Sequence, residues 1–278
     1  QIIGRLPSLM TYSYQVKRRN YLNKSMYIHP IKPEQSTAQS ILNSVRSDRK
    51  FSDEEAKLLD LCMMLHAEHG GGNCSTFAVR TLTSAGTDTY SAVAAGIGAL
   101  KGAKHGGANM KVAEMVEAIR RNVSDITDEE DVENALGMVV RREIGDKTGL
   151  IYGMGHAVYT LSDPRAVLLK ENARSLAEKT GYGDEWKLLD IIERRSPKVF
   201  AEIKGSDKII CANVDLYSGL IYRMLALPED LYTPIFACAR AAGWCAHRME
   251  ELLTGGRIMR PAFKSVSHKQ LYIPIDER

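Results

Sequence analysis

Three segments of this sequence combine glycine with a histidine or a carboxylate, side chains that accept and donate protons. The first is 104–109 (KHGGAN), in which His105 comes just before an amphipathic stretch at 110–122. The dipole at a helix N-terminus disfavours a second proton on an imidazole, so we expect a neutral His105 that donates a hydrogen bond to a developing oxyanion. Taken alone, the segment equally fits a helix-entry turn with an exposed histidine.

The second segment, 152–159 (YGMGHAVY), contains His156 and is followed by Asp163, Pro164 and Arg165. Its glycines allow the backbone to approach a ligand closely, and Arg165 falls in the first turn of the next predicted helix. An arginine beside a helix N-terminus favours a bound carboxylate or phosphate. An ordinary glycine loop with a surface arginine is the alternative.

The third segment, 213–219 (NVDLYSG), places Asp215 within an otherwise apolar region at 209–227. A carboxylate in such surroundings is expected to have its pKa raised toward the range useful for a general base. The alternative is that Asp215 only caps the helix that follows.

A fourth segment, 65–74 (LHAEHGGGNC), suggests a zinc site at first sight. Its histidines, His66 and His69, are three residues apart, whereas HExxH needs four, and no distant ligand set is evident. The sequence therefore disfavours zinc. Arg240 and Arg260, each taken singly, are expected to be solvated or ion-paired.

The composition excludes several classes of protein. With 278 residues, 44% of them hydrophobic, the chain can bury a substantial core and form two domains. A net charge of +3 without a basic block does not suggest a nucleic-acid surface, and no apolar run approaches the roughly 18 residues of a membrane span. Five scattered cysteines without a CxxC pair fit a reduced, cytoplasmic protein. Because the chain opens at Gln1 without a signal peptide, we expect a fragment that begins within a longer protein.

Helix signals dominate the chain, and the predicted fold class is all-α. Capping patterns and glycine stops predict four helices. They are 56–69 after Ser52 and Glu55, a helix after Thr127 and Glu130 to about Arg142, one from Asp163-Pro164 to Gly181 or Gly183, and one from Thr233-Pro234 to 255–256. The best strand candidate, 208–212, is too short to found a sheet.

An alanine- and glycine-rich stretch at 91–102 is also predicted to be helical. Each interior glycine costs about 1 kcal/mol of helix stability relative to alanine. Such a helix persists only if close packing against a neighbour compensates for that cost, so we expect a tightly packed core helix.

Taken together and in order, these segments resemble the citrate synthase family. The resemblance runs from about Pro7 to the end of the chain, through LHAEHGGGNCST, LKGAKHGGAN, GMGHAVYTLSDPR, NVDLYSGLIY, FACARAAGWCAHRMEE and RIMRPAF. It implies an all-α homodimer, with a large domain (1–106 and 228–278) that lacks its N-terminal helices here. A small domain (107–227) would face it, with the active site in the cleft between them.

The resemblance also implies a reaction and roles for named residues. Asp215 would abstract the methyl proton of acetyl-CoA, His105 would stabilise the enolate, and His156 would donate to the carbonyl of oxaloacetate. Citryl-CoA would then be hydrolysed. Oxaloacetate would be bound by His69, Arg165, Arg240 and Arg260, the last from the partner subunit, and CoA by Leu150, Gly153, Gly155 and Lys208. No metal or redox cofactor is implied, because acetyl-CoA arrives as a substrate.

Three alternatives to this reading stay open. A 2-methylcitrate synthase would use propionyl-CoA with the same residues, and one methylene in a pocket gives only about 1–3 kcal/mol of discrimination. A citrate-cleaving lyase would run the reverse carbon–carbon step on the same fold. A non-catalytic zinc-binding or helical interaction module would need none of these side chains for chemistry.

Overall fold

The computed structural model describes residues 1–155, 159, 161–206, 209–268 and 270–278. Within these ranges the secondary structure is helical, and the only pairing of β type is an isolated bridge between Met154 and Ala212. The all-α prediction is therefore confirmed. The helices are α1 (Ile2–Asn20), α2 (Thr37–Val45), α3 (Asp53–His66), α4 (Cys74–Ser84), α5 (Thr89–Leu100), α6 (Ala108–Arg120), α7 (Glu129–Val140), α8 (Pro164–Thr180), α9 (Gly183–Lys204), α10 (Asp215–Met224), the 3₁₀ turn η1 (Glu229–Leu231), α11 (Tyr232–Thr254) and the 3₁₀ turn η2 (Ile275–Glu277).

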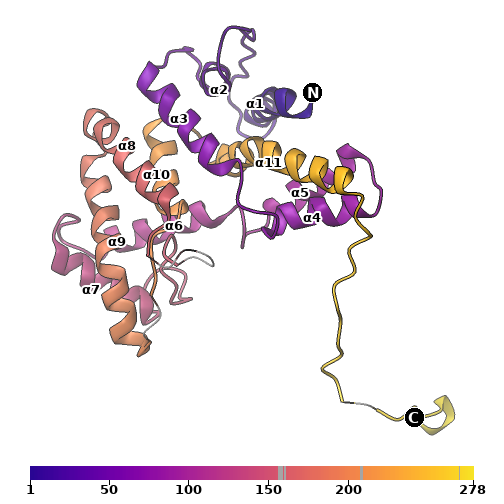
Figure 1. The fold of residues 1–278 in the computed structure, drawn as a ribbon. Coiled ribbons are helices and arrows are strands. Elements are labelled where there is room, and N and C mark those ends of the chain that lie inside the picture. Colours follow the sequence, from indigo (N-terminus) through magenta and orange to yellow (C-terminus); the bar gives the residue numbers. More distant parts are fainter. Residues whose placement is uncertain (156–158, 160, 207–208, 269) are drawn as a thin grey trace.

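The helices form two groups that meet at α3 (Figure 1). In one group, α11 packs against α1, α4 and α5, and in the other α7, α8 and α10 surround α9. Helix α3 contacts α11 on one side and α8 and α10 on the other. This grouping resembles the predicted domains at 1–106 with 228–278 and at 107–227, and the division into domains stays a prediction.

Several helix boundaries follow the predicted caps. Ser52 and Glu55 form a complete capping box at the start of α3, which ends at His66 rather than at 69. At α8, the Asp163 carboxylate accepts from the backbone N–H of Arg165, Pro164 is the first helical residue, and Gly181 ends the helix with φ of 80°. Local capping chemistry was sufficient to locate these ends.

Two predicted helix starts are wrong by one or two residues. Asp128, not Thr127, caps α7, because its carboxylate accepts from the N–H of Asp131 while the Thr127 hydroxyl bonds to Asp125 (2.8 Å). Helix α11 begins at Tyr232, so Thr233 lies inside its first turn. The Thr233 hydroxyl instead donates to the carbonyl oxygen of Gly106, 127 residues away (2.9 Å).

The glycine-rich stretch forms α5, and it packs as closely as predicted. A Cβ added at Gly96 would lie 2.7 Å from Cγ2 of Val79 and 3.0 Å from the ring of Trp244. Only glycine allows α4 and α11 to approach α5 at this point, and the closeness of the three helices offsets the low helix propensity.

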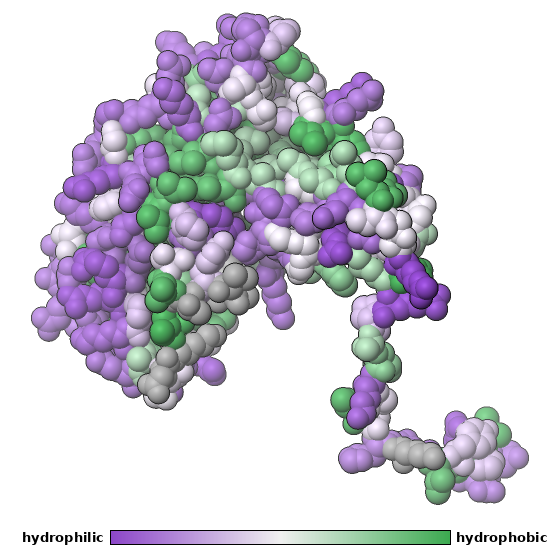
Figure 2. All heavy atoms as spheres, viewed as in Figure 1, coloured by the Kyte–Doolittle hydropathy of each residue, from purple (hydrophilic) through white to green (hydrophobic). Residues whose placement is uncertain are grey.

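Polar and apolar side chains are mixed on the outer surface, and several highly exposed large apolar side chains lie on the segment after α11. This segment extends away from the helices, and Figure 2 shows it clear of the body. Phe263 and Val266 are 91% and 98% exposed, and Leu271 is 88% exposed. Among the described helices, none is both long enough and apolar enough to cross a membrane.

Candidate active site

His105 lies in a tight turn that is fixed from both sides. Its backbone N–H donates to the carbonyl oxygen of Gly102 (2.9 Å), and the N–H of Gly106 donates to that of Leu100 (2.8 Å). A Cβ at Gly106 would lie 2.4 Å from the Leu100 oxygen, so the turn requires glycine there. Helix α6 begins at Ala108, which confirms that His105 comes just before a helix N-terminus.

A polar network from the start of α4 holds the His105 ring. Nε2 of His105 lies 3.1 Å from Oδ1 of Asn73 and 3.1 Å from Oγ of Ser75. Ser75 is fully buried and lies within 2.9 Å of Asn73 Oδ1, and the indole N–H of Trp244 donates to its Oγ (3.1 Å). Burial of the imidazole and the nearby charge of Arg240 lower the pKa of His105. A neutral ring is therefore favoured at pH 7, for reasons of burial and charge that differ from the helix dipole on which the sequence prediction rested.

Arg240 is a buried cation whose described hydrogen bonds go to neutral oxygen atoms. Only 1% of it is exposed, and it donates to the carbonyl of His66 (2.6 Å) and to Oδ1 of Asn73 (3.2 Å). Its guanidinium lies 4.9 Å from the ring centre of Phe236, and burial lowers its pKa to about 10. Arg240 is therefore not the solvated or ion-paired arginine that its local sequence led us to expect. A buried charge of this kind attracts an anionic ligand.

His66 is a second buried histidine in the same place. Its ring packs against that of Phe236 in a tilted arrangement, with ring centres 4.4 Å apart, and Nδ1 has no hydrogen-bond partner within the part of the chain that the structure describes. Burial, with the charges of Arg240 and Arg165, lowers its pKa to about 3. From the sequence, His66 was considered only as a zinc ligand, whereas His69 was predicted to bind oxaloacetate. His69 lies in the turn after α3, half-buried, and its N–H donates to Glu68 (2.8 Å).

Asp215 is the first residue of α10, and no side-chain cap is present at that end. Its own N–H donates to Oδ1 of Asn213 (3.0 Å). Part of its surface is open to solvent, yet surrounding protein raises the pKa of the carboxyl to about 6. Asp163 raises this pKa further, while Arg165 and Arg240 lower it. Asp215 therefore does not cap the helix, and the pKa of its carboxyl suits a general base.

The glycine loop before His156 holds the segment that carries Asp215. The N–H of Gly155 donates to the carbonyl of Cys211 (2.6 Å), and the N–H of Asn213 donates to that of Gly153 (2.8 Å). Gly153 has a φ of 82°, and a Cβ there would lie 2.9 Å from Leu216. The backbone groups predicted to contact CoA therefore also position Asp215. Sequence reasoning did not identify this role.

The remaining CoA and catalytic predictions are only partly placed. Leu150 is 55% exposed beside this loop. His156 and Lys208 lie outside the described residues. The predicted CoA contacts at Leu150, Gly153, Gly155 and Lys208, and the catalytic role of His156, stay predictions.

Arg165 is in the first turn of α8, as predicted. Its Nε lies 3.0 Å from Oδ1 of Asp163 and its Nη2 lies 2.8 Å from Oδ2, a two-point ion pair in which the carboxylate is fully buried. Because its charge acts on His66, Asp215 and Arg240, it belongs to the same cluster. The structure thus brings together side chains that are dispersed over most of the sequence: His66, His105, Arg165, Asp215 and Arg240.

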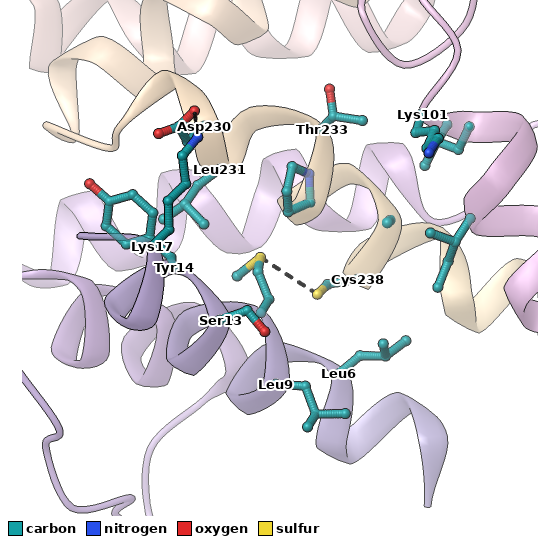
Figure 3. Close-up of a pocket in the computed structure, with 15 residues that line it drawn as sticks. Leu6, Leu9, Ser13, Tyr14, Lys17, Lys101, Asp230, Leu231, Thr233 and Cys238 are labelled. Atoms are coloured by element: carbon teal, nitrogen blue, oxygen red, sulfur yellow. Dashed lines mark hydrogen bonds and ion pairs between the residues drawn. The ribbon is translucent and has the colours of Figure 1, made fainter. Parts of the chain in front are cut away.

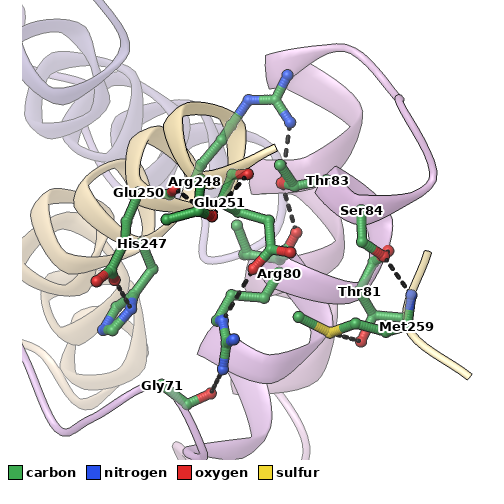
Figure 4. Close-up of polar contacts among 12 residues, drawn as sticks. Gly71, Arg80, Thr81, Thr83, Ser84, His247, Arg248, Glu250, Glu251 and Met259 are labelled. Carbon is green, nitrogen blue, oxygen red and sulfur yellow. Dashed lines mark hydrogen bonds and ion pairs between the residues drawn. The ribbon is translucent and has the colours of Figure 1, made fainter. Parts of the chain in front are cut away.

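Arg260 is not brought to this cluster within one chain. It is exposed and follows Met259, whose N–H donates to Oγ of Ser84 (3.0 Å) at the C-terminal end of α4 (Figure 4). Asn73 and Ser75 lie at the opposite end of this 11-residue helix, which spans about 16 Å.

The arrangement combines a carboxylate with a raised pKa, an imidazole with a lowered pKa and two cations, which together suit proton transfer on an anionic substrate. Within the described ranges, no group of three or more His, Cys, Asp or Glu side chains is placed to hold a metal ion. Asn73, Ser75, Trp244 and His66 were missed by sequence reasoning. The only local signal for Asn73 and Ser75 was their place after the glycine run at 70–72, Asn73 directly and Ser75 two residues later.

The family model described as citrate synthase, C-terminal domain, matches residues 1–262. Citrate synthase from Synechocystis sp. is 35% identical over 281 residues, covering 100% of this chain and 64% of that protein. Citrate synthase from Haloferax volcanii is 38% identical over 224 residues, covering 80% of this chain and 54% of that protein. The chain thus spans little more than half to two thirds of these relatives.

Among solved structures, citrate synthase from Thermoplasma acidophilum in a ternary complex with carboxymethyl coenzyme A and oxaloacetate superposes with a TM-score of 0.78. It is 29% identical, and the match covers 100% of this chain and 68% of that one. The agreement in fold extends over the helices that carry the cluster.

Proposed function

Because the chain belongs to the citrate synthase family, we propose that it carries the catalytic cluster of a citrate synthase, the enzyme that opens the tricarboxylic acid cycle. The reaction condenses acetyl-CoA with oxaloacetate and water to give citrate and CoA. The observation that supports this proposal is that the charge of the buried Arg240 acts both on Asp215, whose pKa is about 6, and on His105, whose pKa is lowered.

The first step is removal of a methyl proton from acetyl-CoA. A thioester α-proton is too weakly acidic for a carboxylate unless the oxyanion is stabilised at the same moment. Asp215 takes the proton, and His105 donates a hydrogen bond to the enolate oxygen. A base with a pKa near 6 is ionised at pH 7 and still basic enough to accept the proton.

The second step joins the enolate carbon to the carbonyl carbon of oxaloacetate. His156 donates to the carbonyl oxygen as the bond forms, a role that comes from the family resemblance. Arg165, Arg240 and His69 bind the carboxylates of oxaloacetate. The buried position of Arg240 favours an anion there, since its described partners are uncharged. Hydrolysis of citryl-CoA then releases both products.

We propose that the active form is a homodimer in which Arg260 completes the site of the other subunit. Arg260 is distant from its own cluster, and the segment that bears it exposes large apolar side chains such as Phe263. The body also has an apolar surface pocket of about 570 Å³ between α1, α5 and α11 (Figure 3). Apolar surface of this extent supports association with a second copy.

A thiol-release assay with oxaloacetate and either acetyl-CoA or propionyl-CoA tests the proposed function. We expect CoA release that depends on oxaloacetate, with the higher kcat/KM for acetyl-CoA. Mass spectrometry of the product should show citrate. Absence of thiol release with both thioesters would overturn the proposal, and a preference for propionyl-CoA would replace citrate with 2-methylcitrate.

A further inference from the structure

One face of α11 leads from the candidate site to the turn that follows α3. Four residues of this helix recur at intervals of three and four and therefore share a face: Arg240, Gly243, His247 and Glu251. Arg240 belongs to the cluster described above. A Cβ at Gly243 would lie 2.6 Å from Oε2 of Glu68 in the turn after α3, so glycine allows the turn to lie directly on the helix.

The turn after α3, residues 67–72, is also held by α4. Nη1 of Arg80 donates to the carbonyl oxygen of Gly71 (3.3 Å), and its Nε lies 3.4 Å from Oε2 of Glu251 (Figure 4). A Cβ at Gly71 would lie 2.9 Å from Nη1 of Arg80 and 3.3 Å from Cε1 of His247. Side chains from α4 and α11 therefore enclose the turn.

The carboxylate of Glu68 closes the turn from within. Its Oε1 accepts from the backbone N–H of His69 (2.8 Å) and from that of Gly70. The same oxygen lies 3.1 Å from Nε2 of His247. Burial raises the pKa of Glu68, but hydrogen bonds from His247 and from the two N–H groups outweigh burial and lower it. Because an ionised carboxylate can only accept, Nε2 of His247 is the donor.

The conformation of this turn sets where two residues of the site lie. His69 is part of it, and the N–H of Asn73 donates to the carbonyl oxygen of Gly70 (3.1 Å) at its end. Oδ1 of Asn73 in turn accepts from Arg240 (3.2 Å). A displacement of the turn would therefore move His69 and Asn73 relative to α11.

The contact between Glu68 and His247 is partly open to solvent. The Glu68 side chain is 48% exposed and that of His247 is 18% exposed, and a pair of this kind contributes little to stability. Its influence on the site is more direct. Burial lowers the pKa of Arg240 and the charge of Glu68 raises it, so the carboxylate acts on the guanidinium as well as on the turn.

We infer that Glu68 and His247 are positioning residues for oxaloacetate: Glu68 closes the turn that carries His69, and His247 fixes this carboxylate to the helix that carries Arg240. The inference rests on the proposed function, because it takes His69 and Arg240 as ligands of oxaloacetate. Two ligands from separate elements bind one dianion well only if their spacing is set before it arrives.

Hydrogen exchange of the full chain without substrate tests the turn itself. The N–H groups of His69 and Gly70 should exchange about 10-fold faster in Glu68→Ala and in His247→Ala, because each variant removes part of their support. Glu250→Ala is the matched control, since Oε2 of Glu250 lies 3.5 Å from Nδ1 of His247 and its side chain is 70% exposed. Unchanged exchange in Glu68→Ala, or equal acceleration in Glu250→Ala, would overturn the inference.

Steady-state kinetics test the consequence for the substrate. Glu68→Ala and His247→Ala should raise KM for oxaloacetate about 5- to 30-fold and change KM for acetyl-CoA less than about 2-fold. Glu68→Gln keeps an oxygen that accepts the two N–H groups, so it should recover most of the loss. Equal rises in both KM values, or a lower KM for oxaloacetate in Glu68→Ala, would overturn a positioning role.

A double variant tests whether His247 acts through Glu68. In Glu68→Ala/His247→Ala, KM for oxaloacetate should be no higher than in Glu68→Ala alone, because the partner of His247 is already absent. Multiplied effects would overturn the link between the two residues. A chain without synthase activity would overturn the proposed function alone, since hydrogen exchange is read without turnover.

Discussion

Burial and the neighbouring arginines shift the pKa of Asp215 in opposite directions. Surrounding protein and Asp163 raise its pKa, while Arg165 and Arg240 lower it, and the result is a pKa of about 6. The sequence predicted the direction of this shift from the apolar residues on either side. It did not predict that Arg165 and Arg240 lower this pKa, because they come near Asp215 only through the packing of α8 and α11.

Asp215→Asn should stabilise the fold at neutral pH while abolishing most activity. An aspartate carboxyl ordinarily has a pKa of 3.8, and the pKa of Asp215 is raised to about 6 in the folded chain, so the native state binds the proton more tightly. The stability from this group is fully present below pH 3.8 and is lost as the pH rises through about 6. At pH 7 the variant should gain about 1–3 kcal/mol of unfolding free energy. Urea unfolding at pH 3.5 and pH 7 measures this, and a variant less stable than wild type at pH 7 would contradict the burial of the charge.

The elements that position the site were predictable where a local signal fixed them. Ser52 with Glu55 and Asp163 with Pro164 marked the starts of α3 and α8, because caps act within a single turn. The prediction that Thr127 caps α7 was wrong because the next residue, Asp128, competes for the same N–H groups. The bond from Trp244 to Ser75 spans 169 residues, and no local pattern contains such contacts.

Helix α11 and the turn after α3 pack closely together at Gly243, and a substitution there tests this packing. A Cβ there would lie 2.3 Å from the carbonyl oxygen of Ala67 and 2.6 Å from Oε2 of Glu68. Gly243→Ala should therefore push this turn away from Arg240 and lower the unfolding free energy by about 1–3 kcal/mol. Gly72→Ala, where a Cβ meets open space, is the control in thermal unfolding. Equal stability of the two variants would contradict the close packing.

At the scale of the whole molecule, the sequence motifs indicated the family, and the family model over 1–262 confirmed it. The proposed dimer and the division at 107 and 227 could not be derived from local chemistry. They depend on how surfaces far apart in the chain, or on separate chains, pack together. The exposure of Arg260 and its neighbours is the feature of this structure that bears on the dimer most directly.

Arg260→Ala should weaken oxaloacetate binding about 10- to 100-fold, the usual effect of losing one charge-assisted hydrogen bond. Arg257→Ala, on the same exposed segment, should leave binding unchanged. Mixing Arg260→Ala with His105→Ala chains should restore activity, because each hybrid dimer then holds one intact composite site. Hybrid dimers that form and remain inactive would contradict a shared site.

The central claim is that Asp215 removes a methyl proton of acetyl-CoA, and isotope exchange tests it most directly. Acetyl-CoA is incubated with the protein in D₂O with malate, whose hydroxyl replaces the reactive carbonyl of oxaloacetate so that condensation cannot follow. Deuterium should enter the methyl group with the wild-type chain and with Asp230→Asn, whose carboxylate pairs with Lys17 at the surface (2.7 Å). In Asp215→Asn the exchange rate should fall by about 10²- to 10⁴-fold. Exchange at the wild-type rate in Asp215→Asn would contradict the assignment of the base.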